Sequence, residues 1–320
     1  MIATEKSLSS QPTVPVEPWR PSLGVRVNDF GMCALAHMGG TLSRLFGNRA
    51  LHTLGILVYH RIAPLTRQVP APPYNVAPRR FREQITGLLK QGFRFVPLKQ
   101  VLDCHGSGEA LPAKSVVVTF DDCFESVYTQ AWPILKEFNI PATLFLSTAY
   151  LDNAAPFPFD TWAQEFAEFV PADHYRPLST EQCQKLLDSG LVELGTHTHT
   201  HADFRQHVME FVDEMETAAE ILRLRFGVEQ PSFSLPFGNP HAGYASPELL
   251  EAARSAGATC ALTTETSLVD VRTDPFGWGR LNVFDWDTSA TLAGKLNGWY
   301  DWAPCWKHRL RNALRGRVSP

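Results

Sequence analysis

The sequence predicts an α/β protein built as a (β/α) barrel, and three observations lead to this prediction. From about residue 51 onward, short apolar runs alternate with amphipathic stretches, which is typical of parallel strands joined by crossover helices. About seven of the runs are short enough, and rich enough in β-branched residues, to be strands. No glycine-rich phosphate-binding motif follows any of them, so an open dinucleotide-binding or P-loop sheet is not supported.

The first half of the barrel begins with the apolar run 54–60, which is expected to be the first strand. A helix is expected over 78–91 because Phe81, Ile85 and Leu88 recur at helical spacing. The valine-rich run 116–120 is expected to be a strand buried on both faces. Further elements are expected as extended segments at 93–97 and 142–146 and as a helix over 127–138.

The second half is expected to start with a helix over 180–189, with Thr180 as its N-cap. A strand at 192–195 then enters a histidine-rich turn, and a long helix over 204–226 is stopped by Gly227. The remaining expected elements are strands at 232–236, 260–263 and 280–284 and a helix over 247–256.

The composition fits a globular protein that does not collect nucleic acid. Of 320 residues, 44% are hydrophobic and 19% are charged, and 29 Lys and Arg against 33 Asp and Glu give a formal net charge of -4. No apolar run approaches the roughly 20 residues of a membrane-spanning helix, so no transmembrane segment is expected. The six cysteines form no C-x-x-C pair and are expected to be reduced thiols.

The two ends of the chain are expected to lie outside the barrel, which we assign to residues 49–296. Residues 1–48 are interpreted as an N-terminal extension whose first 22 or so residues, polar and rich in proline, are disordered. They hold no apolar segment of a secretory signal, so a cytoplasmic location is expected. Residues 297–320 combine aromatic and basic residues, which suits a helix covering the barrel or peripheral contact with a membrane, an anionic polymer or another subunit.

Two polar clusters follow expected strands, and the first is Asp121 and Asp122 within Thr119-Phe120-Asp121-Asp122-Cys123. Adjacent carboxylates at a barrel mouth disfavour double ionisation unless a cation compensates their charge. A bound metal is one explanation, and a solvated Asp-Asp turn is the other.

The second cluster is Gly195-Thr196-His197-Thr198-His199-Thr200-His201. Three alternating histidines are difficult to explain by packing, whereas neutral imidazoles at His197 and His201 suit metal ligation. One carboxylate and two histidines from separate strand ends would leave coordination positions open for water and substrate, as in a hydrolytic metal site.

These motifs resemble those of the polysaccharide deacetylases, the NodB-homology fold of carbohydrate esterase family four. Thr119-Phe120-Asp121-Asp122-Cys123 resembles the family's T-F-D-D-G motif, and the segment 197–201 resembles its H-[ST]-x-x-H motif. Weaker similarity extends over about 54–296 and includes the segments 59–62, 81–85, 141–145 and 236–238.

The resemblance implies a distorted (β/α)7 barrel and a hydrolase that removes N-acetyl groups from an amino sugar in a polysaccharide or glycan precursor, such as an exopolysaccharide. By the same resemblance, Asp122, His197 and His201 hold a divalent metal, usually zinc, and Asp121 is the general base. The backbone N–H of Phe237 would stabilise the oxyanion.

Two departures from the family pattern matter. The arginine of the motif Arg-x-Pro-Tyr-Gly is replaced by serine in Ser234-Leu235-Pro236-Phe237-Gly238, and Arg280 is hypothesised to reach Asp121 instead, with an ordinary surface arginine as the alternative. The late Leu-x-His motif that supplies the general acid has no match. His60 at the first strand end is the preferred substitute, His199 is the second candidate, and a purely structural His60 is the alternative.

Several other residues have two interpretations each. Asp160 either caps a helix, which is preferred, or lines the substrate cleft with Trp162. Trp278 and Trp286 either stack on sugar rings or pack in the barrel. Cys123 replaces a glycine and is either a bystander or sensitive to oxidation.

The leading prediction is therefore a metal-dependent N-deacetylase acting on an acetylated glycan, of undetermined oligomeric state. An O-acetyl esterase is the first alternative, because an ester needs a weaker general acid. A carbohydrate-binding pseudoenzyme and an amidohydrolase-type barrel are the others, and the latter would need further metal ligands that are not evident.

Overall fold

The computed structural model describes residues 34, 37–42, 45, 53–66 and 69–299. The predictions for the first 22 residues and for most of the aromatic and basic segment 297–320 lie outside the described residues.

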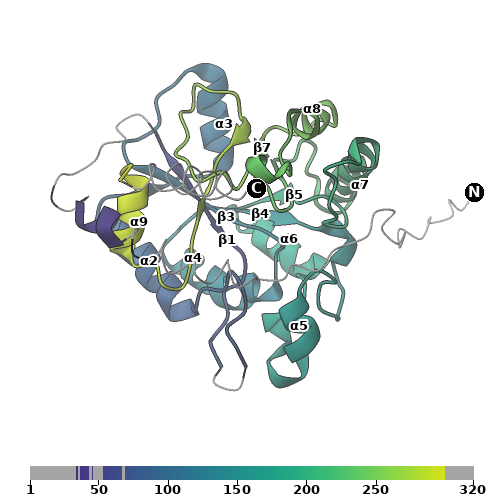
Figure 1. The fold of residues 1–320 in the computed structure, drawn as a ribbon, viewed down its shortest axis with the longest axis horizontal. Helices are drawn as coiled ribbons and strands as arrows, with labels where there is room; N and C mark the ends of the chain where they lie inside the picture. Colours follow the sequence, from purple (N-terminus) through teal and green to yellow (C-terminus); the bar gives the residue numbers. More distant parts are fainter. Residues whose placement is uncertain (1–33, 35–36, 43–44, 46–52, 67–68, 300–320) are drawn as a thin grey trace, which may run out of the picture.

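The described strands form one curled parallel sheet with helices around it (Figure 1), which confirms the (β/α)-barrel prediction. The strand order is β8-β7-β6-β5-β4-β3-β1-β9, and β2 pairs with β3 at the side. Every pairing between these strands is parallel. The strands are β1 (Gly55–Tyr59), β2 (Arg94–Phe95), β3 (Ser115–Phe120), β4 (Ala142–Leu146), β5 (Val192–Thr196), β6 (Phe233–Ser234), β7 (Ala261–Leu262), β8 (Phe276–Trp278) and β9 (Leu281–Asn282).

The described helices surround this sheet, and some of them also pack on one another: α2 packs on α9, and α7 packs on α8. They are α2 (Pro78–Lys90), α3 (Leu98–Ser107), α4 (Trp132–Glu137), α5 (Thr161–Phe166), α6 (Thr180–Asp188), α7 (Val208–Phe226), α8 (Pro247–Ser255) and α9 (Ser289–Leu296).

The core forms where the sequence patterns placed it. All six residues of β3 are buried, as expected for a strand covered on both faces. Phe81, Ile85 and Leu88 on α2 are fully buried and share one apolar cluster with residues of β1 and β3. Burial of a large apolar side chain contributes about 1.5–3 kcal/mol, so this face anchors α2 to the sheet.

Three details of the expected helices are wrong. The N-cap of α6 is Ser179, whose hydroxyl accepts from Gln182 N at 3.1 Å while the Gln182 side chain accepts from Ser179 N at 2.9 Å. The long helix α7 begins at Val208 rather than at 204, although Gly227 ends it in a left-handed conformation as expected. The expected helix over 127–138 opens with a π turn, Val127–Ala131, because Pro133 cannot donate the backbone hydrogen bond that an α-helix requires there.

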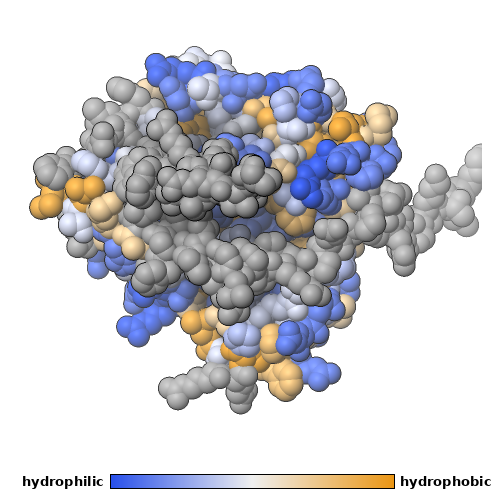
Figure 2. All heavy atoms as spheres, in the orientation of Figure 1, coloured by the Kyte–Doolittle hydropathy of each residue, from blue (hydrophilic) through white to orange (hydrophobic). Residues whose placement is uncertain are grey.

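The outer surface shows no single dominant apolar region in the view of Figure 2. Hydrophobic side chains reach it among hydrophilic ones, for example over α7 and α8. Within the described residues, no helix combines the length and the apolar character needed to cross a bilayer.

Candidate active site

The site lies where β3 and β5 end, with β4 between them. Asp121 and Asp122 directly follow β3, and the segment 197–201 directly follows β5. Because parallel strands present their carboxyl ends on one side of a barrel, these segments meet although they are far apart in the sequence.

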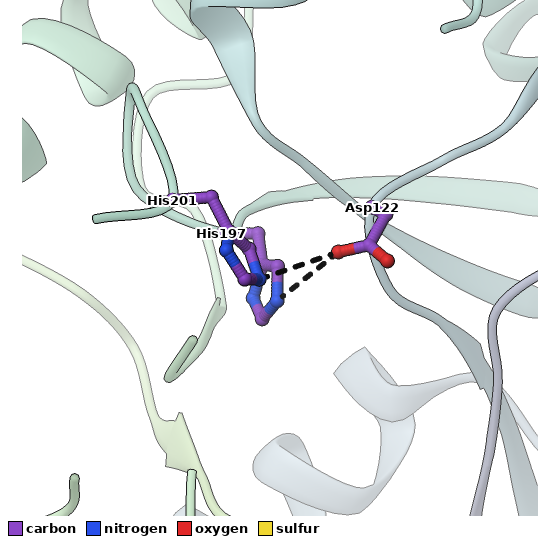
Figure 3. Close-up of side chains that lie close together, drawn as sticks. All are labelled: Asp122, His197 and His201. Carbon is purple, nitrogen blue, oxygen red and sulfur yellow. Dashed lines mark ion pairs between the residues drawn. The ribbon is translucent and has the colours of Figure 1, made fainter. Parts of the chain in front are cut away.

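The structure brings Asp122, His197 and His201 together (Figure 3). Asp122 Oδ1 lies 3.6 Å from His197 Nε2 and 3.5 Å from His201 Nε2. One candidate ligand atom from each residue lies within 4.8 Å of those of the other two. Two ligands of a tetrahedral zinc ion, each about 2.1 Å from it, are about 3.4 Å apart, so the observed spacing suits a shared cation.

The chemistry of these groups also fits a cation. Asp122 Oδ1 is buried without a hydrogen-bond partner among the described residues. Burial, followed by the charges of Asp121 and Asp160, raises the pKa of Asp122 well above its ordinary value. A positive ion at this point would restore ionisation of the carboxylate and give the orphaned oxygen a partner.

The electrostatics of the two imidazoles suit neutral metal ligands. Burial lowers the pKa of both His197 and His201, and for His201 the charge of His197 lowers it further. His197 Nδ1 lies 2.7 Å from the carbonyl oxygen of Ser234, so this nitrogen donates and the lone pair of Nε2 faces Asp122.

Asp121 forms a buried pair with Arg280. Two guanidinium nitrogens of Arg280 donate to the two Asp121 oxygens at 2.7 Å each, and both side chains are at most 2% exposed. Arg280 also donates to Ser234 Oγ at 2.7 Å and to the carbonyl of Thr263 at 3.0 Å. Burial raises the pKa of Asp121, but the charge of Arg280 outweighs it, so the pKa lies well below its ordinary value and the group is ionised. The hypothesised contact is therefore present, and the surface-arginine alternative is wrong.

His60 follows β1 and lies close enough to the site for its imidazole to interact electrostatically with Asp121 and His197. Its imidazole is partly buried and stacks on the Tyr74 ring, with centroids 4.9 Å apart. Burial lowers its pKa to about 4, partly offset by the charge of Asp121, while Arg280 and His197 lower it further. His199, the second candidate for the general acid, is buried with Nδ1 2.9 Å from Thr148 Oγ1, which occupies one of its ring nitrogens.

Asp160 has the preferred capping role and a second one that the sequence did not reveal. Its side chain accepts from Ala163 N at the start of α5, and it also forms a buried ion pair with Arg61. The Arg61 guanidinium lies over the rings of Phe124 and Trp162, at 4.1 and 4.9 Å from their centroids. Trp162 is buried and donates to the Pro70 carbonyl, so it packs rather than lining a cleft.

The two other tryptophans differ in their surroundings. Trp278 is 4% exposed, so sugar stacking on it is not supported. Trp286 is partly exposed, with Phe284 stacked on its ring at 5.1 Å and the Lys295 ammonium 4.8 Å from its centroid, so both interpretations of Trp286 stay predictions. Cys123 is buried, and burial raises the pKa of its thiol well above the usual range, so an oxidation-sensitive thiolate is not favoured.

Phe237 has a left-handed φ of 60°, and the centroid of its ring is 4.9 Å from that of the His201 ring. A positive φ is costly for a phenylalanine, and such strain concentrates at functional sites. The oxyanion role of its backbone N–H remains a prediction.

Comparison with known proteins gives an independent view of the chain. Residues 108–261, which contain both polar clusters, match the family described as polysaccharide deacetylase. The chain is 34% identical over 117 residues to a poly-beta-1,6-N-acetyl-D-glucosamine N-deacetylase of Escherichia coli K12. This aligned region covers 37% of this chain and 16% of that protein. The chain is 28% identical over 147 residues to the protein of the same name from Staphylococcus epidermidis, covering 46% and 45% of the two chains. The chain therefore spans less than two thirds of the length of these relatives.

Solved structures share the fold over a larger part of the chain. The structure of IcaB from Ammonifex degensii superposes with a TM-score of 0.61 and 25% identity, covering 76% of this chain and 97% of that one. The Streptococcus pyogenes deacetylase PplD, solved in complex with acetate, gives a TM-score of 0.62 at 19% identity over 77% and 99% of the two chains. The latter likeness concerns the fold alone.

Proposed function

Because residues 108–261 match the polysaccharide deacetylase family, we propose that the chain removes N-acetyl groups from an amino sugar within a polysaccharide or its precursor. The observation that carries the proposal is the meeting of one carboxylate and two neutral imidazoles beside a second, arginine-paired carboxylate. A purely structural cluster would gain nothing from an orphaned carboxylate oxygen in a buried position.

We assign Asp122, His197 and His201 as the residues that hold a divalent metal, with zinc as the preferred ion because of its nitrogen and oxygen ligands. A metal bound there would supply Lewis acidity and lower the pKa of a water molecule toward about 7. The hydrogen bond from His197 Nδ1 to Ser234 fixes the orientation of one ligand ring before any ion arrives.

Asp121 is assigned as the general base that accepts a proton from the attacking water. Arg280 keeps this carboxylate ionised and fixes its two oxygens. Ser234 Oγ also donates to Asp121 Oδ2 at 3.3 Å, so Oδ1 is the oxygen that keeps a lone-pair direction for the proton. The N–H of Phe237 is assigned to the developing oxyanion.

His60 is assigned as the group that donates a proton to the leaving amine. Its pKa of about 4 leaves the imidazole neutral at pH 7, so it must receive a proton during the reaction before it can donate one. Its position beside Asp121 and His197, with which it interacts electrostatically, suits such an internal transfer.

The substrate proposal follows from the relatives, whose name specifies a poly-beta-1,6-N-acetyl-D-glucosamine. We propose an N-acetylglucosamine polymer of an exopolysaccharide as the substrate class. The test is acetate release by the purified, zinc-loaded chain from N-acetylglucosamine oligomers and, in parallel, from O-acetylated glycans. Release from the N-acetylated set supports the proposal, while release from the O-acetylated set alone favours the esterase alternative. Binding of glycan without any acetate release would support a pseudoenzyme.

A further inference from the structure

The turn between the two histidine ligands is held by a carboxylate from another element. Glu214 on α7 is 8% exposed, and its Oε2 accepts from the backbone N–H groups of His199 and Thr200 at 2.9 and 2.6 Å. Its Oε1 accepts from Thr200 Oγ1 at 2.9 Å. All three donors belong to residues that lie between His197 and His201.

This turn has a backbone that needs support. Thr198 and His201 adopt left-handed φ values of 64° and 59°, which cost residues with a Cβ atom about 1–2 kcal/mol each. Thr198 Oγ1 accepts from His201 N at 3.0 Å, and the Tyr150 hydroxyl donates to the Thr200 carbonyl at 2.9 Å. Glu214 supplies the acceptor for the two buried N–H groups at the centre of the turn, which would otherwise be unsatisfied.

The position of Glu214 in its helix is unusual. It stands on the buried face of α7, next to Met215 and in line with Phe211 and Ala218. A helix face that packs on a sheet ordinarily carries apolar residues, and glutamate is almost never buried without partners. The hydrogen bonds from the turn, and not the packing of α7, therefore explain why a carboxylate is buried on this face.

We propose that Glu214 is a positioning residue for the metal site, setting the separation of the two imidazoles by accepting three hydrogen bonds from the turn that joins them. The inference rests on the proposed metal site and adds a residue that does not touch the ion. Hydrogen-bonding partners that orient metal ligands typically contribute a factor of about 10–100 in metal affinity.

The test is zinc affinity, measured on metal-free protein by titration against a competing chelator. Glu214→Met keeps the volume but removes both acceptors, and its dissociation constant is expected to rise about 10- to 100-fold. Glu214→Gln is expected to stay within about threefold of the parent, because the amide oxygen can accept both N–H bonds while the NH2 donates to Thr200 Oγ1. Glu216→Gln, an exposed position on the same helix, is the matched control and is expected to leave the affinity unchanged.

Equal affinity of Glu214→Met and the parent overturns the inference, and so does a Glu214→Gln variant that is as weak as Glu214→Met. If Glu214→Met does not fold, Thr200→Val removes a single hydrogen bond and is expected to weaken binding about fivefold, with no weakening counting against the inference. If the parent chain itself binds no zinc, the proposed metal site is overturned. This result differs from the outcomes above, in which the parent binds zinc and only the effect of the variants fails to appear.

Discussion

Replacing Arg280 by methionine tests the role of the buried pair that it forms with Asp121. The variant keeps a long side chain but removes two hydrogen bonds of 2.7 Å to the Asp121 carboxylate, in a place where Arg280 is fully buried. Removing one partner of a buried ion pair costs about 3–5 kcal/mol, because the other charge is left uncompensated. That is a large part of the 5–15 kcal/mol by which a domain is typically stable, so a marked fall in the midpoint of urea unfolding is expected at pH 7.

The loss has a definite dependence on pH. The pKa of Asp121 is lowered in the folded parent, so the pair contributes stability above the unfolded pKa of about 3.9 and loses it as the pH falls through the lower, folded value. The difference in unfolding free energy between the metal-free parent and Arg280→Met is therefore expected to be largest at pH 7 and to shrink as the pH falls. Without Arg280, burial raises the pKa of Asp121 above its unfolded value, so the variant gains stability as the pH falls toward about 4, and the parent loses stability below about pH 4. A difference that is constant from pH 7 to 3 would contradict the ionic nature of the pair.

The same variant is expected to lose activity. Without Arg280, burial favours the protonated form of Asp121, which cannot accept a proton, and a positioned general base contributes about 10²–10⁴ to the rate. Acetate release by Arg280→Met at pH 7 should fall at least 100-fold. Arg280→Lys keeps the charge but not the bidentate geometry, so its rate of acetate release should lie between those of the parent and Arg280→Met. An Arg280→Met protein within about 1 kcal/mol of the parent and with parental turnover would refute the reasoning.

Three further predictions concern the groups around the site. His60→Ala should lower kcat about 10²–10⁴-fold while the zinc content stays that of the parent, and an unchanged kcat would remove His60 from the mechanism. Tyr74→Phe should keep the ring that stacks on His60 and therefore keep kcat, whereas Tyr74→Ala should lower kcat. The effect of Tyr74→Ala should disappear when His60 is already replaced by alanine, and an equal effect with and without His60 would show that Tyr74 does not act through His60. Asp160→Asn should destabilise the chain by about 3–5 kcal/mol in thermal or urea unfolding, because it leaves the Arg61 charge buried without its partner, and a change under 1 kcal/mol would show that this pair is not important.

Much of the fold could be predicted because its long elements carry strong patterns. The expected strand at 142–146 coincides with β4, β3 and β5 differ from expectation by one residue at one end, and β1 is shorter than expected by one residue at each end. Helix α3 was missed because it begins after Pro97 without a side-chain cap, and β8 was missed because Gly277 interrupts its apolar run. Two- and three-residue strands gain their pairing from the neighbouring sheet and not from local propensity.

The meeting of the three residues of the proposed metal site could be predicted from the sequence, whereas the residues that support them were harder to predict. Asp122, His197 and His201 carry metal-binding chemistry in their own side chains and follow recognisable strands. The Arg61 and Asp160 pair joins segments 99 residues apart in sequence, and nothing local to either residue indicates the other. Glu214 had a signal, a glutamate on an otherwise apolar helix face, but the sequence does not show which turn that face meets.

Metal content is the most direct test of the proposed site. The purified parent, freed of metal and reloaded with zinc, is expected to hold one ion per chain after gel filtration and to release acetate. Asp122→Ala is expected to lose the ion, while Asp121→Asn is expected to keep it and to stop releasing acetate. Retention of a full equivalent of zinc by Asp122→Ala, or by a variant lacking both His197 and His201, would contradict the assignment of these three side chains to one cation.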